Sequence, residues 1–328
     1  MIISRTPFRI SFFGGGTDYP VWYEENGGAV LSTTIDKYCF LSCRYLPPFF
    51  EYKHKISYST IESVKHINEI QHPVVRALLN FLKIKEGVEI SHNADLPART
   101  GLGSSSSFTV GLLNALYALK SVMPTKHKLA KDAIHIERDI LKEAVGSQDQ
   151  VAASYGGLNK TTFSKSGSFI VEPVILPDKR LGEFHSHLML YFTGFARYAS
   201  EIAKKQVETT HKKERELHEM FKMVDEGKKI LTSRGNITDF GKLMKESWLL
   251  KRSLTNKITN PEIDKIHDDA LSAGALAGKL LGAGGGGFML LFVRPKDKLS
   301  VRRKLKGLLE VGFNFDNYGS QIVFYDKQ

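Results

Sequence analysis

A glycine- and serine-rich loop that runs directly into a helix with apolar periodicity most constrains how this chain can fold. The stretch from Leu96 to Ser107 reads L-P-A-R-T-G-L-G-S-S-S-S, and apolar residues then recur at helical spacing from Phe108 to Leu119. A helix N-terminus offers N–H groups without intrahelical acceptors and a partial positive charge, which suits phosphate. The loop therefore predicts a nucleotide-phosphate site, although glycine and serine also form plain loops and helix caps that need no ligand.

A second glycine cluster, from Gly282 to Gly287, precedes the apolar run Phe288–Phe292. It matches G-x-G-x-x-G, but we expect a helix over residues 260–281 before it and a strand after it. That order is the reverse of what a dinucleotide-binding fold requires, and neither glycine cluster has the Gly-Lys-Ser/Thr of a Walker A loop. Five glycines in six residues cost chain entropy. Either a ligand or a neighbouring backbone must approach closely here, or the run is a long turn between a helix and a strand.

A third cluster, Pro7 to Asp18, places Arg9 inside an apolar strand and Asp18 at the end of a glycine turn. Arg9 could simply face outward, and Asp18 could simply cap a turn or a helix.

Glu137 lies in the middle of an apolar helical stripe, where a carboxylate is either exposed or held by a cation, since an unpaired buried charge is costly. Asp149 follows in a polar turn. Phosphoryl transfer needs such a set, namely backbone amides, acids for Mg²⁺ and for the attacking hydroxyl, and a cation.

The remaining pattern indicates an α+β or mixed α/β chain with strands and helices throughout. The 328 residues suffice for two domains, and we expect a boundary near residue 180, giving units 1–180 and 181–328. Residues 30–35 and 38–45 are expected to form a hairpin around Asp36 and Lys37, and residues 128–144 a helix. Cys39 and Cys43 on one strand would lie about 13 Å apart, too far for a disulfide.

Composition and charge narrow the classes of partner. The chain is 42% hydrophobic and 25% charged, as in ordinary globular proteins, and has neither a membrane-length apolar run nor a signal-peptide layout. The net charge of +11 suits nucleic acid, but it also suits ATP and phosphorylated metabolites. Basic residues are spread along the chain without a nucleic-acid-binding motif. We therefore expect a cytoplasmic protein that binds neither nucleic acid nor membrane, and free thiols fit that compartment.

The three clusters together, in this order, resemble the motifs of the GHMP kinases, the superfamily of galactokinase, homoserine kinase, mevalonate kinase and phosphomevalonate kinase. The resemblance extends across nearly the whole chain. It implies an N-terminal domain like the second domain of ribosomal protein S5 and a ferredoxin-like C-terminal domain, with ATP and an acceptor between them.

The resemblance also implies roles for individual residues. Asp149 and Arg9 would be catalytic, and Ser105 and Glu137 would hold Mg²⁺. The ATP-binding loop would comprise Pro97, Arg99, Thr100, Gly101, Leu102, Gly103, Ser104, Ser105 and Ser106. The acceptor would contact Gly15, Gly16, Thr17, Asp18, Asp149, Gly284, Gly285 and Gly286. Arg197 is a further candidate for a phosphate on the acceptor, unless it is a solvated residue at a helix start.

One departure from the family narrows the acceptor. Galactokinases carry Gly-Glu-His-Thr-Asp where this chain has Gly14-Gly-Gly-Thr-Asp18, so galactose loses two contacts. The motif forms here resemble those of D-glycero-D-manno-heptose 7-phosphate kinases, which implies phosphorylation of the anomeric hydroxyl to the 1,7-bisphosphate for surface polysaccharide. Alternatives are a fucose- or hexosamine-type anomeric kinase, a non-catalytic sugar- and ATP-binding relative, or an RNA-binding module with the S5-like fold. A homodimer is also compatible with the sequence.

Overall fold

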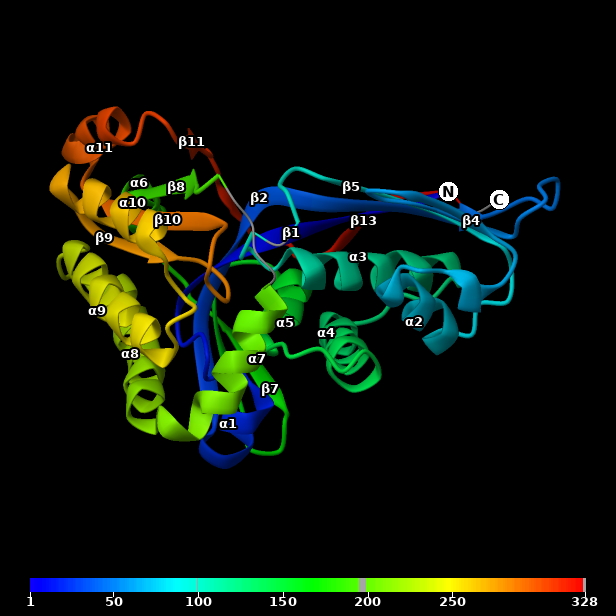
Figure 1. The fold of residues 1–328 in the computed structure, drawn as a ribbon, viewed down its shortest axis with the longest axis horizontal. Helices are drawn as coiled ribbons and strands as arrows, with labels where there is room; N and C mark the ends of the chain where they lie inside the picture. The colour runs from blue at the N-terminus through cyan, green and yellow to red at the C-terminus, as the bar shows by residue number, and fades with distance from the viewer. Residues whose placement is uncertain (99, 195–198, 327–328) are drawn as a thin grey trace.

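The computed structural model describes residues 1–98, 100–194 and 199–326, which form two layered regions (Figure 1). One region is built on a long sheet near both chain ends, with a layer of helices beneath it. The other is built on a smaller antiparallel sheet with its own helices. The α+β expectation is confirmed, with both regions mixing helix and strand.

The described residues of the first region form a nine-stranded sheet around β1 (Ile2–Phe13) and β2 (Gly28–Tyr45). Its main path runs β13-β1-β2-β5-β3-β4. The other strands on this path are β5 (Val88–Ala94), β3 (His54–Ser57), β4 (Ile61–Val64) and β13 (Gln321–Tyr325). Strand β6 (Asn159–Phe163) also pairs with β2, and β7 (Phe169–Pro173) pairs with β6.

The hairpin expected around Asp36 and Lys37 is wrong. Residues 28–45 form one strand, and its register against β1 shifts between Pro7 and Phe8, so Asp36 and Lys37 sit in an irregularity. The cause lies at the far end of the chain. The Asp36 N–H donates to the carbonyl of Asn314, and the Asn314 N–H donates to the Asp36 carboxylate over 2.7 Å. A polar dipeptide that resembles a turn thus anchors a distant segment instead.

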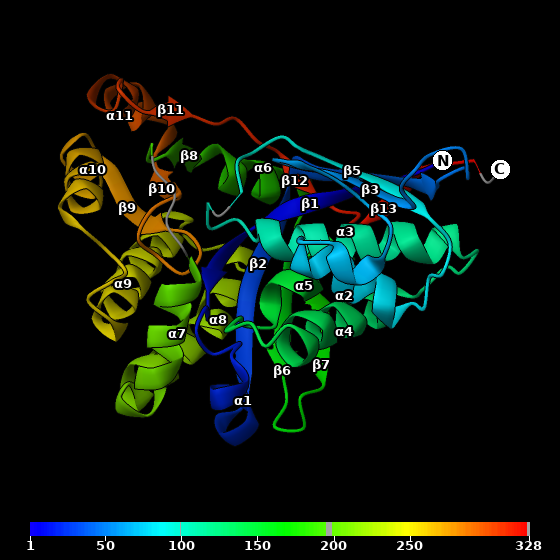
Figure 2. The same ribbon diagram turned by 45° about the vertical axis from the view of Figure 1, so that its right-hand side comes forward.

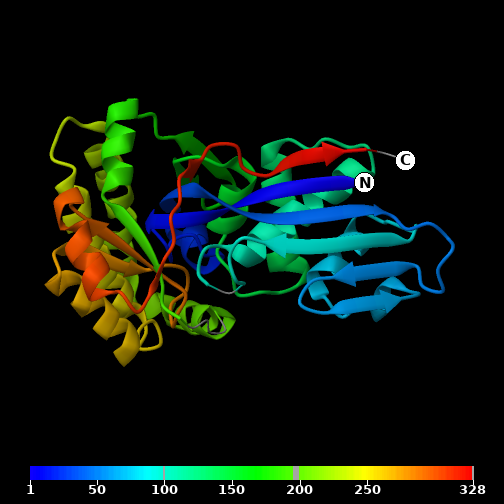
Figure 3. The same cartoon turned by 90° about the horizontal axis from the view of Figure 1, so that it is seen from above.

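Helices cover one face of the large sheet and leave the other face open (Figure 3). The central helix α3 (Ser104–Leu119) packs on β1 and β2 and is buried from Ser106 onward. Around it lie α2 (Pro73–Phe81), α4 (Lys126–Ile134) and α5 (Gln148–Tyr155), with α1 (Pro20–Asn26) near the lower end in Figure 2. The helix expected over residues 128–144 instead passes after Ile134 into a π-helical turn, His135–Ile140. Such turns are uncommon and occur often at functional sites.

The second region contains an antiparallel sheet in the order β11-β8-β10-β9. Its strands are β8 (Leu188–Phe192), β9 (Ala275–Leu280), β10 (Phe288–Val293) and β11 (Leu309–Glu310). Its helices are α6 (Asp178–Ser186), α7 (Ala199–Thr209), α8 (Glu214–Thr232), α9 (Thr238–Leu254), α10 (Pro261–Ser272) and α11 (Lys298–Lys304). The chain then returns to the large sheet through β12 (Phe315–Asp316) and β13. A domain boundary near residue 180, dividing the chain into residues 1–180 and 181–328, remains a proposal.

The helix expected over residues 260–281 is too long. It ends at Ser272, and Gly274, at φ +105°, turns the chain into β9. The segment Ala275–Leu280 contains good helix formers, but it pairs with β10 from Ala275–Val293 to Leu280–Met289. Tertiary pairing overrides local propensity here. The second glycine cluster is therefore a strand-to-strand connection.

Two smaller expectations can also be compared with the structure. Both Cys39 and Cys43 are free and buried, and both lie on β2, as the spacing predicted. Within the described residues, no helix has the length and apolar character needed to cross a membrane.

Candidate active site

The three glycine-containing clusters, far apart in the sequence, border one cavity of about 600 Å³. Its wall includes Gly15 and Gly16, then Gly101 and Gly103, and then Gly282. This volume is within the range of ordinary small-molecule sites. The cavity therefore unites residues from both layered regions.

The loop before α3 is held by both regions at once. The Arg9 N–H donates to the Leu102 carbonyl over 3.0 Å, and the Phe288 N–H donates to the Thr100 carbonyl over 3.2 Å. A Cβ on Gly101 would lie 2.4 Å from the Leu281 carbonyl oxygen. Gly101 therefore has to be glycine for the loop to pack against the β9–β10 connection.

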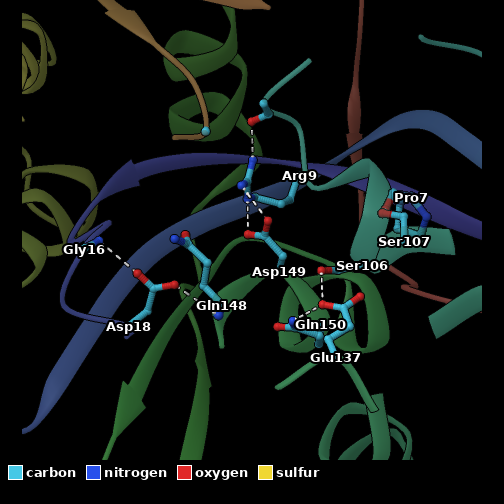
Figure 4. Close-up of polar contacts among 12 residues, drawn as sticks. Pro7, Arg9, Gly16, Asp18, Ser106, Ser107, Glu137, Gln148, Asp149 and Gln150 are labelled. Carbon is cyan, nitrogen blue, oxygen red and sulfur yellow. Dashed lines mark hydrogen bonds and ion pairs between the residues drawn. The ribbon is translucent and has the colours of Figure 1, made fainter. Parts of the chain in front are cut away.

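Arg9 and Asp149, both in the cavity wall, form a bidentate ion pair (Figure 4). The Arg9 Nε and Nη2 atoms donate to the two Asp149 carboxylate oxygens over 2.7 and 2.8 Å, and Nη1 donates to the Gly101 carbonyl over 2.7 Å. Paired, charge-assisted bonds of this kind fix both groups. The arginine within the apolar strand thus faces inward, not outward, and is only 4% exposed.

Asp18 is held beside this pair by the backbone. Its carboxylate accepts from the Gly16 N–H over 2.9 Å and from the Gln148 N–H over 3.4 Å, and the side chain is 1% exposed. Burial raises the pKa of Asp18, with a smaller contribution from the Asp149 charge. A Cβ on Gly146 would lie 1.9 Å from an Asp18 carboxylate oxygen, so this position also requires glycine. These contacts fix the position of the Asp18 carboxylate in the cavity wall.

Glu137 is fully buried in the π-helical turn, and within the described side chains it forms no ion pair with a cation. Its Oε2 accepts from the Ser106 hydroxyl over 2.8 Å and from the Gln150 amide, while Oε1 has no partner. Burial raises its pKa to about 7. Glu137 is thus neither exposed nor paired with a cationic side chain among the described residues, which leaves a buried carboxylate with one unused oxygen.

These residues fit a nucleotide with a divalent cation. Helix α3 is preceded by its N-cap residue Gly103, which adopts the left-handed conformation and provides no side-chain cap. The helix N-terminus can therefore face a phosphate. Glu137 Oε1 offers a ligand atom of the kind that Mg²⁺ prefers. Ser105 is exposed and lines the cavity, whereas Ser106 is the residue whose hydroxyl bonds to Glu137.

Several expected site residues lie away from the cavity surface. Leu102 is buried, Pro97 is exposed outside the wall, and the Thr17 hydroxyl donates to the Gly14 and Ala29 carbonyls within the turn. Among the described wall residues, Gly282 and Ala283 represent the β9–β10 connection, and Gly284, Gly285 and Gly286 do not appear. Arg99 and Arg197 lie outside the described residues.

The structure also adds wall residues that the motifs did not identify. Ser11 Oγ and Gln148 Oε1 are buried without partners and border the cavity near Gly15. Two buried lysines, Lys251 and Lys279, also belong to the wall. In the sequence, Lys279 follows Gly278 but is followed by Leu280, so it fails the Walker A pattern. Nothing in the sequence marked Lys251.

Comparison with known families gives two matches. Residues 68–157 match the model of the GHMP kinases N terminal domain, and residues 229–310 match that of the GHMP kinases C terminal. Together the two matches cover more than half of the chain.

Comparison with individual proteins agrees. A D-glycero-alpha-D-manno-heptose 7-phosphate kinase of Campylobacter jejuni is 29% identical, covering 93% of each chain. A bifunctional fucokinase/GDP-fucose pyrophosphorylase of Arabidopsis thaliana is 27% identical over 94% of this chain and 31% of its own length. The crystal structure of a D-glycero-D-manno-heptose 1-phosphate kinase from Bacteroides thetaiotaomicron superposes with a TM-score of 0.82 over the full length of both chains, at 24% identity.

Proposed function

Since the chain belongs to the GHMP kinases and is a sugar kinase, we propose that it phosphorylates the anomeric hydroxyl of D-glycero-D-manno-heptose 7-phosphate. The products would be the 1,7-bisphosphate and ADP, supplying GDP-heptose for surface polysaccharide. The observation that carries this proposal is the Arg9–Asp149 pair, which lines the cavity beside Gly103 at the start of α3.

The reaction is an in-line displacement at phosphorus. The anomeric oxygen forms a bond to the γ-phosphorus of ATP as the bond to the β–γ bridging oxygen breaks, and ADP carries away that electron pair. Asp149 orients the acceptor hydroxyl and accepts its proton. The Arg9 guanidinium, held between Asp149 and the Gly101 carbonyl, stabilises the negative charge that builds on the transferred group.

The other wall residues divide between the two substrates. The backbone from Gly101 to Ser106 would hold the ATP phosphates. Asp18, with the Ser11 and Gln148 oxygens nearby, would accept hydrogen bonds from sugar hydroxyls. Ser105 and Glu137 would hold Mg²⁺, which neutralises phosphate charge when bound.

The choice of acceptor rests on the relatives and on the first motif. The Campylobacter jejuni relative is named for a heptose 7-phosphate and the Bacteroides structure for a heptose 1-phosphate. A sugar that already carries a 1-phosphate has no free anomeric hydroxyl, so the two names imply different attacking oxygens. The missing Glu and His of the galactokinase motif support an acceptor other than galactose.

ADP release with Mg²⁺ and ATP across a panel of acceptors tests the proposal. The panel contains D-glycero-D-manno-heptose 7-phosphate, the 1-phosphate, the free heptose, fucose, galactose and mevalonate. We expect strong preference for the 7-phosphate, with the product phosphate assigned to the anomeric carbon by NMR. Preference for fucose or the free heptose would keep the chemistry and overturn the acceptor, and preference for the 1-phosphate would overturn the attacking oxygen.

A further inference from the structure

Two buried lysines from the second region line the cavity. Lys251 lies on α9 and is 7% exposed, and Lys279 lies on β9 and is 3% exposed. Both belong to the cavity wall. They come from different elements of the second region, and both reach into the space that the substrates would share.

Neither lysine has a carboxylate partner among the side chains that the structure describes. Lys251 Nζ donates to the carbonyls of Leu280 and Gly282 over 2.8 and 2.5 Å. Lys279 Nζ donates to the carbonyl of Phe12 over 2.5 Å. Carbonyl oxygens satisfy part of the hydrogen-bonding capacity of an ammonium group, which has three N–H bonds, but they do not balance its charge.

The electrostatic surroundings make the pair costly without an anion. Burial lowers the pKa of both lysines, and each is lowered further by the Arg9 charge, with Lys279 also acting on Lys251. Of the acids on the same wall, Asp149 binds Arg9 and Asp18 binds backbone N–H groups. Neither of these, nor the wall residue Glu143, forms an ion pair with either lysine among the described side chains. Buried charges are generally paired or bound to a ligand. An apolar side chain of similar length would fill these positions at lower cost.

One of the two ammonium groups lies near the phosphate loop and the other near the turn proposed for the acceptor. Lys251 bonds to Gly282, and a Cβ on Gly282 would lie 2.4 Å from the Gly101 Cα atom of the phosphate loop. Lys279 bonds to Phe12, on the strand that leads into the Gly14–Asp18 turn proposed for the acceptor. The lysines thus extend from the edge of the phosphate loop to the acceptor turn.

We propose that Lys251 and Lys279 form a subsite for a phosphate group, in addition to the contacts made by the Gly101–Ser106 backbone. The phosphate is either the one that the acceptor already carries or the one that is being transferred. This inference rests on the proposed function, because the choice between these two sources depends on which acceptor the enzyme uses. Binding of inorganic phosphate tests the subsite independently of any turnover.

The first experiment measures the thermal midpoint of the full chain with increasing inorganic phosphate. The wild type is compared with Lys251→Met, Lys279→Met and the double variant, with Lys204→Met as the matched control, because Lys204 is an exposed cation on the same cavity wall. We expect the phosphate-dependent rise in Tm to persist in the control and to be lost in the double variant. An unchanged response in the double variant, or a loss caused by Lys204→Met instead, overturns the subsite. The single variants carry the test if the double variant does not fold.

The second experiment separates the two sources by kinetics. If the acceptor's own phosphate is bound, the variants raise KM for heptose 7-phosphate by about tenfold or more per lysine, while KM for ATP and turnover of the free heptose are unchanged. If the transferred phosphoryl group is bound, kcat falls for both acceptors alike. A rise in KM for ATP belongs to this second case, because the transferred group is the γ-phosphate of ATP. Unchanged kcat and KM values for ATP and for both acceptors overturn the proposal. Should the wild type use neither sugar, the acceptor assignment fails, and the phosphate-induced Tm shift still decides the subsite.

Discussion

The two sides of the cavity differ in how their charges are balanced. On the side built from β1, α3 and α5, Arg9 and Asp149 neutralise each other, and Asp18 accepts from backbone N–H groups. On the side built from α9 and β9, Lys251 and Lys279 donate to backbone carbonyl oxygens, and Lys251 Nζ also lies 5.9 Å from the centre of the Trp248 ring. Among the described side chains, no carboxylate pairs with either lysine. The first side is therefore organised before substrates bind, whereas on the second we propose that a bound phosphate supplies the counter-charge.

This difference separates two ways in which a protein prepares for phosphate. Bidentate pairing fixes the orientation of Arg9 and Asp149 without a substrate, so little reorganisation is needed during the reaction. Unbalanced cations instead store an attraction for an anion at the expense of stability. Changes on the first side should therefore reduce the rate, and changes on the second should alter binding and stability.

The largest expected effect comes from Asp149→Asn. It keeps the side chain's shape but removes the charge that orients Arg9 and the capacity to accept a proton. We expect kcat to fall by roughly 10²–10⁴-fold, with ATP affinity measured by calorimetry nearly unchanged. Turnover close to that of the wild type would remove Asp149 from the reaction.

Glu137→Gln tests the buried carboxylate that accepts a hydrogen bond from Ser106, a residue of the cavity wall. It retains hydrogen bonding to Ser106 but loses the negative charge. We expect the Mg²⁺ concentration for half-maximal activity to rise about tenfold or more, in titrations at saturating ATP and acceptor. An unchanged Mg²⁺ titration would make Glu137 a structural residue.

Gly146→Ala tests whether the first side is as tightly built as its contacts indicate. The new Cβ would lie 1.9 Å from an Asp18 carboxylate oxygen, so Asp18 or the turn must move. We expect a loss of roughly 1–3 kcal/mol in the free energy of unfolding and a higher KM for the acceptor.

Gly182→Ala is the matched control for this substitution. A Cβ on Gly182, within α6, would meet nothing within 4 Å, and helix propensity favours alanine there. We expect stability to stay the same or rise slightly in denaturant unfolding. Equal behaviour of the two variants would mean that the contact between Gly146 and Asp18 is not restrictive.

Lys279→Met should have the smallest effect of these substitutions. In contrast to Gly146→Ala, it should raise the stability of the folded chain. The pKa of Lys279 is lowered to about 7, first by burial and then by Arg9, whereas its ordinary value is 10.5. The folded protein therefore binds fewer protons than the unfolded chain between these values, and stability rises with pH there. The cost of the buried charge is greatest at pH 7 and below. It diminishes as the pH rises towards 10.5.

Removing this charge should therefore stabilise the chain most at low pH. We expect Tm without phosphate to rise by about 2 °C or more at pH 6 and the gain to shrink between pH 7 and 10. Lys251→Met, whose parent lysine faces Lys279 and Arg9, should change Tm in the same direction. A loss of stability at pH 6 would mean that the carbonyl contacts outweigh the charge.

Local sequence patterns predicted those helices and strands for which the local preference of the residues and their tertiary packing favour the same structure. The helix expected from the apolar spacing of Phe108 to Leu119 and the strand expected at Phe288–Phe292 correspond closely to α3 and β10. Prediction failed where distant chain segments decide the structure. Asp36 and Lys37 resemble a turn but meet the C-terminal segment, and Ala275–Leu280 resembles a helix but pairs as a strand.

The candidate site divides in the same manner. Motif order in the sequence identified Arg9, Asp18, Glu137 and Asp149, because a charged residue in an apolar strand or stripe, or after a glycine turn, is unusual enough to be noticed locally. Lys251 gives no such signal, since a lysine on a helix is ordinary until its neighbours are known. The Arg9–Asp149 pairing joins residues 140 positions apart, and it likewise required the fold.

The amino-acid sequence by itself determined the chemistry of this protein, a kinase of the GHMP type, because its glycine, serine and acidic motifs are local and ordered along the chain. The tertiary structure alone decided which charges are balanced. Whether a buried ammonium or carboxylate has a partner depends on segments brought together by β-sheet pairing and helix packing. For Lys251 and Lys279 those segments provide carbonyl oxygens and no carboxylate among the described side chains.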